Sequence, residues 1–308
     1  MTQLGVRLHL DLSNSQKGLI TVKGRTSPLP NLLVHNWYRI LIAMLTVNND
    51  LMINTGGSAY NARVTGALPY GAPQIWDGLG TVPEALSDYT ITSAAALVTT
   101  VSFGVLADRM RIAFGANASK DGTELGLTLT CYDTAGNAQR FLAGRKVVSF
   151  LKGDPISWNV DLYQPWVYNW LSILRGLILN ENRPDLLDMA GTVYTLRISG
   201  AQAVAGPVYL CVGTGTGDFS FYDYTLTDPA KLTTTSTRGV TGLHALLFLS
   251  GSIVPTADIV MGELGIVQPL YDTGGVTHDT LLARFRISPT ITLPANKRSI
   301  ITVRWLAY

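Results

Sequence analysis

Two segments of the chain carry apolar residues at helical spacing. Residues 30–47 and 165–179 each begin with a proline and continue with mostly apolar side chains. Proline is favoured in the first turn of a helix, and apolar residues every three or four positions are typical of a buried helix face. We therefore expect one short apolar helix in each segment. The spaced apolar positions of the first segment are Leu33, Trp37, Ile40, Leu41 and Met44.

Short runs rich in valine, isoleucine, threonine and aromatic residues make up most of the remaining chain. Turns containing glycine, proline and aspartate separate these runs, which is typical of antiparallel strands. Nothing alternates strand and helix in the manner of a parallel α/β sheet. We therefore expect an all-β fold that is mainly antiparallel. The expected strands span residues 96–105, 109–113, 125–132, 145–150, 194–198, 208–212, 243–249, 281–287 and 299–306.

The N-terminal segment, residues 1–28, forms a unit of its own. Two alternating segments, residues 6–12 and 18–23, flank a polar turn at 13–16, which predicts a β-hairpin or an extended arm. Such an arm could add strands to the sheet edge of a neighbouring molecule. We then expect deletion of residues 1–24 to leave the rest folded but to weaken assembly. The apolar residues of this assembly arm are Val6, Leu8, Leu10, Leu12, Leu19, Ile20 and Val22.

Short motifs of the first half return in the same order in the second half. The separation between matching motifs grows along the chain and never shrinks, which indicates a tandem copy with small insertions in the second half. We expect two β-sandwich or jelly-roll-like domains, residues 29–161 and 162–308, each with one helix at its start; an immunoglobulin-like strand order is equally compatible. The matching pairs are Asn36-Trp37 with Asn169-Trp170, 57–60 with 191–194, 88–92 with 223–227, 124–127 with 263–266, 132–134 with 271–273, Arg140-Phe141 with Arg284-Phe285, and Trp158 with Trp305.

Composition narrows the classes of function. The 308 residues are 47% hydrophobic and 14% charged, against about 25% charged in typical soluble domains. The 23 basic and 21 acidic residues leave a net charge of +2, without the basic excess of a nucleic-acid-binding protein. A surface with so few charges favours self-association.

Export, membrane insertion and disulfide bonding have little support in the sequence. The N-terminus lacks a basic start followed by an apolar stretch, and no window holds about 18 uninterrupted apolar residues. Cys131 and Cys211 lie in apolar runs, so we expect buried free thiols. These features predict a protein of a reducing compartment, or a particle component assembled inside a cell.

Candidate catalytic and metal-binding groups are sparse. His9, His35, His244 and His278 lack the spacing of metal ligands, and the glycine-rich residues 213–217 lack the Gly-Lys-Ser/Thr ending of a phosphate loop. Acidic loops could serve glycoside hydrolysis or bind calcium, but such residues more often cap turns. We expect no enzymatic activity, no metal and no cofactor. The acidic loop residues are Asp77, Glu84, Asp88, Asp218, Asp223 and Asp228, and Glu124 and Glu263 are expected to be structural.

Aromatic residues on the connecting loops are the remaining candidates. They could stack on sugars, pack under loops or fill a subunit interface, where tyrosine and tryptophan are enriched. For residues 219–224 a buried or interfacial position is the favoured interpretation. The candidate interface or ligand residues are Trp76, Tyr89, Phe219, Phe221, Tyr222 and Tyr224.

The order of motifs in the second half resembles a known family. Val-Gly-Thr-Gly at 212–215 is followed by Glu-Leu-Gly-Ile at 263–266, Tyr-Asp at 271–272, Leu-Leu-Ala-Arg at 281–284 and a closing strand with Val303 and Trp305. Together with His35-Asn36 at the first helix, this order is similar to a β-rich structural virion protein family of tailed bacteriophages and related prokaryotic viruses. The first half departs from it, with Trp-Asp-Gly at 76–78 and Gln-Arg-Phe-Leu at 139–142. The resemblance implies a particle component without catalysis.

These expectations combine into a structural virion protein, a capsid or tail component that assembles through duplicated β-sandwich domains. A trimer would present six similar domains as a pseudo-hexameric ring. The expected partners are further copies of the chain and other virion proteins, with neither a specific nucleic acid nor a membrane. The expected location is the virion, assembled in the host cytoplasm. The alternative is a fibre-like adhesin that binds a receptor or glycan through tandem sandwich modules.

Overall fold

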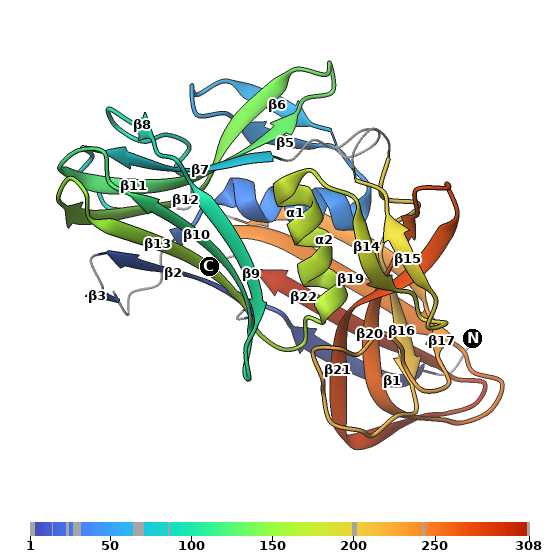
Figure 1. Ribbon diagram of the computed structural model, residues 1–308. Helices are drawn as coiled ribbons and strands as arrows, with labels where there is room; N and C mark the ends of the chain where they lie inside the picture. The colour runs from blue at the N-terminus through green and yellow to red at the C-terminus, as the bar shows by residue number, and fades with distance from the viewer. Residues whose placement is uncertain are drawn as a thin grey trace.

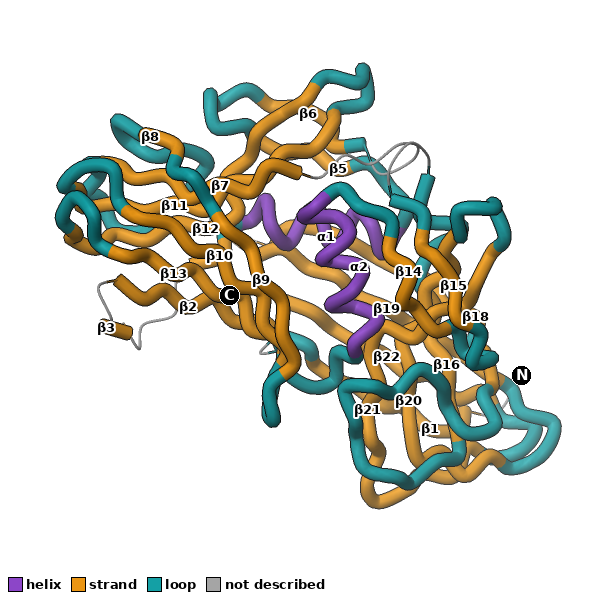
Figure 2. The backbone as a smooth tube through the Cα atoms, in the orientation of Figure 1, coloured by secondary structure: helices purple, strands orange, loops and turns teal. Residues whose placement is uncertain are grey.

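The chain folds mainly into β-strands. The computed structural model describes residues 4–13, 15–22, 25–26, 32–63, 71–85, 87–198, 202–241 and 244–306, with 55% strand and two helices. The strands pair mostly antiparallel, which confirms the mainly-β prediction. Figure 1 shows sheets on either side of two central helices, and Figure 2 distinguishes these elements by colour. Residues 30–31 of the first expected helix and Asn14 of the expected turn lie outside the described residues.

Both expected helices form, and both begin later than their prolines suggest. They are α1 (His35–Thr46) and α2 (Tyr168–Leu179). Each ends at a residue in the left-handed region, Val47 with φ 53° and Asn180 with φ 55°. The left-handed turn lets backbone N–H groups bond to the last carbonyls of the helix, which ends it sharply.

Strands of the N-terminal half form two five-stranded sheets. Their strands are β2 (Gln16–Val22), β3 (Arg25–Thr26), β4 (Leu32–Leu33), β7 (Gly71–Gly78), β8 (Ala95–Ala96), β9 (Thr100–Val105), β10 (Met110–Asn117), β11 (Gly122–Tyr132), β12 (Ala138–Phe150) and β13 (Pro155–Leu162). The strand orders are β4-β12-β11-β7-β8 and β3-β2-β13-β10-β9. The single strand expected at 96–105 is two strands, one in each sheet.

Two four-stranded sheets make up most of the C-terminal half. Their strands are β1 (Leu4–Asp11), β16 (Tyr209–Gly213), β17 (Ala230–Lys231), β18 (Thr233–Thr241), β19 (His244–Ile253), β20 (Ile259–Tyr271), β21 (Thr277–Leu293) and β22 (Arg298–Leu306). The strand orders are β17-β16-β20-β21 and β1-β22-β19-β18. All strands in these two sheets except β1 come from the second half of the chain.

A two-stranded hairpin follows each helix. After α1 the pair is β5 (Asp50–Ile53) with β6 (Ala59–Ala62), and after α2 it is β14 (Arg183–Leu187) with β15 (Val193–Leu196). Isolated bridges join Ala62 to Asp133 and Leu196 to Asp272, so each hairpin contacts the turn of a long hairpin. The sequence pattern identified only β15 of these four strands.

The N-terminal segment does not form the expected hairpin. Within the described residues, β1 pairs parallel with β22 while β2 pairs antiparallel with β13, so the two strands belong to sheets of different halves. The chain crosses between these sheets at Leu12–Ser15, where the Leu12 N–H donates to the Arg304 carbonyl at 2.7 Å and the Tyr163 N–H donates to the Ser15 carbonyl at 2.9 Å. Of the expected arm residues, Leu12, Ile20 and Val22 are buried, and Val6, Leu8, Leu10 and Leu19 are half-buried.

One continuous apolar core joins the two halves. Helix α1 packs against β12 of its own half and β19 of the other, while α2 packs against β21 and against β7. The Trp166 ring lies 5.0 Å from that of Trp170 and 5.3 Å from that of Trp305, and Tyr38 of α1 meets Trp305 edge-on at 6.1 Å. Side chains from both halves therefore fill the region around the expected boundary at residue 161.

Candidate functional site

A buried carboxylate and a buried arginine form a cluster in the N-terminal half. Glu124 on β11 is fully buried, and its Oε1 accepts a hydrogen bond from Nε of Arg145 on β12 at 2.5 Å. Its Oε2 accepts from the N–H groups of Gly80 at 3.0 Å and Thr92 at 2.8 Å. Arg145 also donates to Asp88 Oδ2 at 2.9 Å and to two carbonyl oxygens of the same loop. The cluster thereby fastens the β7–β8 loop to its sheet.

The same chemistry recurs in the C-terminal half. Nε of Arg284 on β21 donates to Oε2 of Glu263 on β20 at 2.6 Å, and the Thr227 N–H donates to Oε1 at 2.5 Å. Arg284 also donates to Asp223 Oδ2 at 2.9 Å and to two carbonyls of the β16–β17 loop. The spacing along the sequence agrees as well: the two glutamates are as far apart as the two arginines, and the two aspartates are as far apart as the two threonines.

Both clusters are electrically compensated. Burial opposes the guanidinium charges, but hydrogen bonds to the glutamate and the aspartate outweigh it and raise the pKa of Arg145 and Arg284. A buried charge is tolerated only when it is paired and hydrogen-bonded. These carboxylates are therefore committed to holding loops. This agrees with the structural role expected for Glu124 and Glu263.

Asp88 and Asp223, two of the acidic loop residues, cap turns. Asp88 Oδ2 accepts the Ala85 N–H at 2.8 Å, and Asp223 Oδ2 accepts the Ser220 N–H at 2.8 Å. Asp77 is buried and accepts two hydrogen bonds from Ser119. Within the part of the chain that the structure describes, no group of three or more histidine, cysteine or acidic side chains is arranged to hold a metal ion.

A second polar contact in the N-terminal half ties the β5–β6 hairpin to the long β11–β12 hairpin. Asn54 Nδ2 donates to Gln139 Oε1 at 3.0 Å, and Gln139 Nε2 donates to Asp133 Oδ2 at 2.9 Å. Asn54 Oδ1 also accepts two backbone N–H groups of its own turn. Two neutral amides thus connect the tips of the two hairpins.

In the C-terminal half an imidazole between two carboxylates makes the corresponding contact. His278 Nδ1 lies 2.9 Å from Asp188 Oδ2, and its Nε2 lies 3.5 Å from Asp272 Oδ2. The His278 ring stacks on Tyr194 at 4.2 Å. Burial opposes ionisation of Asp188, but hydrogen bonds from His278 and from the N–H groups of its own turn outweigh it and lower the pKa. The Asp272 pKa is also lowered, chiefly by the Val276 N–H.

Two of the candidate aromatic residues pack on turn glycines. Tyr89 is 39% exposed and Tyr224 36%, yet a Cβ placed on Gly57 would lie 3.3 Å from the Tyr89 ring, and one on Gly191 would lie 3.5 Å from the Tyr224 ring. Both glycines have positive φ, 85° and 84°, which favours glycine for the backbone as well. Each tyrosine therefore covers the turn of the hairpin that follows a helix.

The other candidate aromatics are partly covered. Trp76 on β7 is half-buried, with the Arg140 guanidinium 5.9 Å from its ring. Phe219 and Phe221 meet edge-on at 5.2 Å, and Phe221 is buried. The structure therefore brings Phe219 and Phe221 together but places Trp76 and Tyr89 in the other half of the chain.

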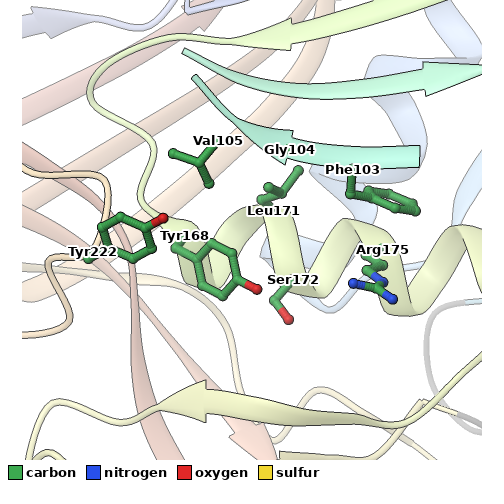
Figure 3. A pocket seen from close by; sticks show the side chains of 8 residues that line it. All are labelled: Phe103, Gly104, Val105, Tyr168, Leu171, Ser172, Arg175 and Tyr222. Carbon is green, nitrogen blue, oxygen red and sulfur yellow. The ribbon is translucent and has the colours of Figure 1, made fainter. Parts of the chain in front are cut away.

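Tyr222 lies at a small pocket between the halves (Figure 3). It is 64% exposed, and its ring is 5.7 Å from that of Tyr168. The pocket has a volume of about 200 Å³. In its wall the Tyr168 hydroxyl donates a hydrogen bond to Asp185 at 2.9 Å, and the Arg175 guanidinium lies 5.4 Å from the centre of the Phe103 ring. Its lining residues are Phe103, Gly104, Val105, Tyr168, Leu171, Ser172, Arg175 and Tyr222.

The two cysteines are buried free thiols, as the sequence predicts. Burial raises the pKa of Cys131 to about 12 and that of Cys211 to about 11. The thiolate is the reactive form, so both side chains act as small apolar groups near neutral pH. Among the described helices, neither is long and apolar enough to cross a membrane.

The sequence motifs pair Arg284 with Arg140, so they do not point to Arg145. The strand register shows the better match: Arg145 lies opposite Gly126, as Arg284 lies opposite Gly265. Arg145 and Arg284 are also as far apart in the sequence as the two glutamates, and that shared spacing was the signal that could have found the pair. Comparison with known proteins adds no relative, since no family model, curated protein or solved structure matches this chain.

Proposed function

We propose that this protein is a non-enzymatic structural component of a prokaryotic virus particle, assembled from many copies of the chain. We further infer that each chain contains two copies of one β-sandwich unit. Three features support this proposal. They are the recurring strand order, the recurring buried clusters and the open strand edges.

Strand order supports the duplication. The order β8-β7-β11-β12 in the first half corresponds to β17-β16-β20-β21 in the second, and β9-β10-β13 corresponds to β18-β19-β22. The place beside β13 is taken by β2 and the place beside β22 by β1. Each unit would then comprise two facing sheets, a helix and a hairpin.

The observation that carries the proposal is the repeated Glu–Arg–Asp cluster. A catalytic group need be present only once, whereas a group that determines the fold recurs with the unit it stabilises. Glu124 with Arg145 and Glu263 with Arg284 form corresponding ion pairs, and each glutamate accepts a hydrogen bond from the threonine N–H of the corresponding loop. The recurrence of this buried charge in both halves therefore supports a scaffold.

Open strand edges and low charge support assembly. In the described residues the four main sheets end at β3, β9, β4, β8, β1, β18, β17 and β21. The outer edge of β21 is partly covered, because the Arg284 N–H donates to the Pro165 carbonyl and the Val167 N–H donates to the Leu282 carbonyl. Exposed edges readily pair with other chains. With only 14% charged residues, little of the surface opposes such contacts. The motif resemblance favours a virion, in which trimers would form pseudo-hexameric rings.

The adhesin alternative has weaker support. The Arg140 guanidinium lies over the Trp76 ring, and Tyr224 packs on Gly191, so part of each ring is already in contact with the protein. On the adhesin hypothesis, Trp76→Ala with Tyr224→Ala should abolish glycan retention. On the scaffold hypothesis the same pair should leave assembly unchanged.

Light scattering over a range of protein concentrations tests the proposal. The expected result is a mass that is a large multiple of the 33.2 kDa chain. A stable monomer at high concentration that is retained on a glycan column would favour the adhesin and overturn the proposed function.

A further inference from the structure

Strand β1 presents an open backbone edge. It is the end strand of its sheet, with β22 on one side and no other strand beside it among the described residues. In Figure 1 the dark blue β1 lies among the orange and red strands of the C-terminal half, beside β20 and β21. An edge of this kind offers unpaired N–H and C=O groups to another chain.

The register of β1 fixes which backbone groups face outward. The Leu12 N–H donates to the Arg304 carbonyl, and Leu10 lies opposite Val303 in the parallel ladder. Backbone groups alternate between the two sides of a strand, so the even-numbered residues bond to β22. The N–H and C=O groups of Arg7, His9 and Asp11 therefore point away from the sheet.

The side chains of β1 divide in the same way. Arg7, His9 and Asp11 are exposed on one face of the sheet, while Leu8 and Leu10 lie half-buried on the face that packs against the core. Asp11 Oδ2 accepts from Arg304 at 2.6 Å. Burial opposes its ionisation, but hydrogen bonds from Ser13 and Arg304 outweigh it and lower the pKa, so the carboxylate is charged at neutral pH.

We propose that two copies of the chain pair antiparallel through their β1 edges, with His9 opposite His9 at a twofold axis. This inference rests on the proposed self-association and specifies one of its contacts. The register places Arg7 of each copy opposite Asp11 of the other, and Leu8 opposite Leu10. Two four-stranded sheets thereby become one continuous sheet across the pair.

Charge selects this register over its neighbours. Only outward-facing residues can oppose one another as hydrogen-bonded pairs, so the register shifts in steps of two residues. A shift of two residues sets Arg7 opposite His9, or His9 opposite Asp11, and leaves no arginine opposite an aspartate. A shift of four residues centres the pair on Arg7 or on Asp11 and sets two like charges face to face. Opposite charges across a strand pair are favourable and like charges are unfavourable. The register centred on His9 makes two such ion pairs and apposes the leucines.

Cysteine crosslinking tests the register in the full-length protein. Cα atoms of a hydrogen-bonded antiparallel pair are about 5.5 Å apart, within the range of a disulfide. His9→Cys should therefore form a disulfide-linked dimer under mild oxidation. Arg7→Cys alone should not, because its copies would be four residues out of register, about 14 Å apart. A mixture of Arg7→Cys and Asp11→Cys chains should crosslink again.

Proline substitution tests the edge independently. The His9 ring bonds to the Thr302 hydroxyl, so His9→Ala serves as the reference that has already lost this side-chain contact. Relative to that reference, His9→Pro removes only an outward N–H from each copy, so it should leave the melting temperature unchanged and weaken the contact about 10- to 100-fold. Leu10→Pro is the matched control, since it removes an inward N–H and should lower the melting temperature.

The outcomes separate this contact from the proposed function. If the protein assembles but His9→Cys forms no crosslink and His9→Pro has no effect, the β1 contact is overturned. The scaffold proposal then still stands. A wild-type protein that stays monomeric would overturn both. Crosslinking of Arg7→Cys with itself would refute the register.

Discussion

Neutralising Glu124 gives the sharpest test of how the fold is held together. In Glu124→Gln the amide must face two sets of donors, the Arg145 Nε on one side and the N–H groups of Gly80 and Thr92 on the other. Whichever way the amide turns, its NH₂ group opposes a donor. Arg145 keeps only Asp88 as a charged partner.

The expected cost is about 3–5 kcal/mol, the range for breaking one side of a buried ion pair. Unfolding entropy of about 2.1 cal/mol/K per residue gives about 0.65 kcal/mol/K for 308 residues. The melting temperature should therefore fall by about 5–8 °C, as measured by calorimetry. Glu263→Gln should cost a similar amount, because Arg284 and Thr227 surround it in the same manner.

Glu181→Gln, at an exposed position, is the matched control and should shift the melting temperature by less than about 1 °C. Unfolding must be a single reversible transition for the comparison to hold. A loss below about 1 kcal/mol at either buried glutamate would refute the idea that these clusters hold the loops. A large loss at only one of them would contradict their equivalence.

Three further predictions concern charge, the N-terminal strands and a close contact. The lowered pKa of Asp188 stabilises the fold above the unfolded pKa of about 4, and this stability is lost as pH falls through the folded pKa. In the double variant Asp188→Asn with His278→Gln, the melting temperature should therefore fall less steeply as the pH is lowered. An unchanged dependence of melting temperature on pH would count against this prediction. Ile20→Ala, at a side chain 1% exposed, should cost about 2–5 kcal/mol in urea titration, and a loss under about 1 kcal/mol would show β2 to be peripheral. Gly213→Ala should cost about 1–3 kcal/mol of stability, because the new Cβ would lie 2.7 Å from a buried carboxylate oxygen. Gly217→Ala should be tolerated, because its Cβ would lie 3.9 Å from the nearest neighbouring atom. Equal effects of the two substitutions would contradict the packing.

The local sequence pattern predicted where helices and strands form better than it predicted which strands pair. The helices at residues 35–46 and 168–179 fall within the expected segments because apolar spacing and proline act locally. Strand partners depend on contacts distant in sequence, so the pairing of β1 with β22, which lie at opposite ends of the chain, had no local signal. The expected hairpin was wrong for that reason. With Ile20 buried in the core, we now expect deletion of residues 1–24 to destabilise the fold.

The buried charged residues were likewise only partly predictable from the sequence. The matching sequence motifs include Glu124 and Glu263, but they pair Arg284 with Arg140, since both arginines precede phenylalanine. The strand register, which places Arg145 opposite Gly126, is a tertiary property. The contacts of Gln139 and His278 had no signal in the sequence, because an amide and an imidazole do not match by residue type although each is the second residue of a long strand.

Negative-stain electron microscopy of the purified wild-type protein tests the central claim most directly. The account predicts rings, tubes or shells of uniform size, with subunits in which two similar lobes can be distinguished. Their symmetry would separate a tail component from a capsid component. A field of isolated monomers at the highest soluble concentration would contradict the assembly role.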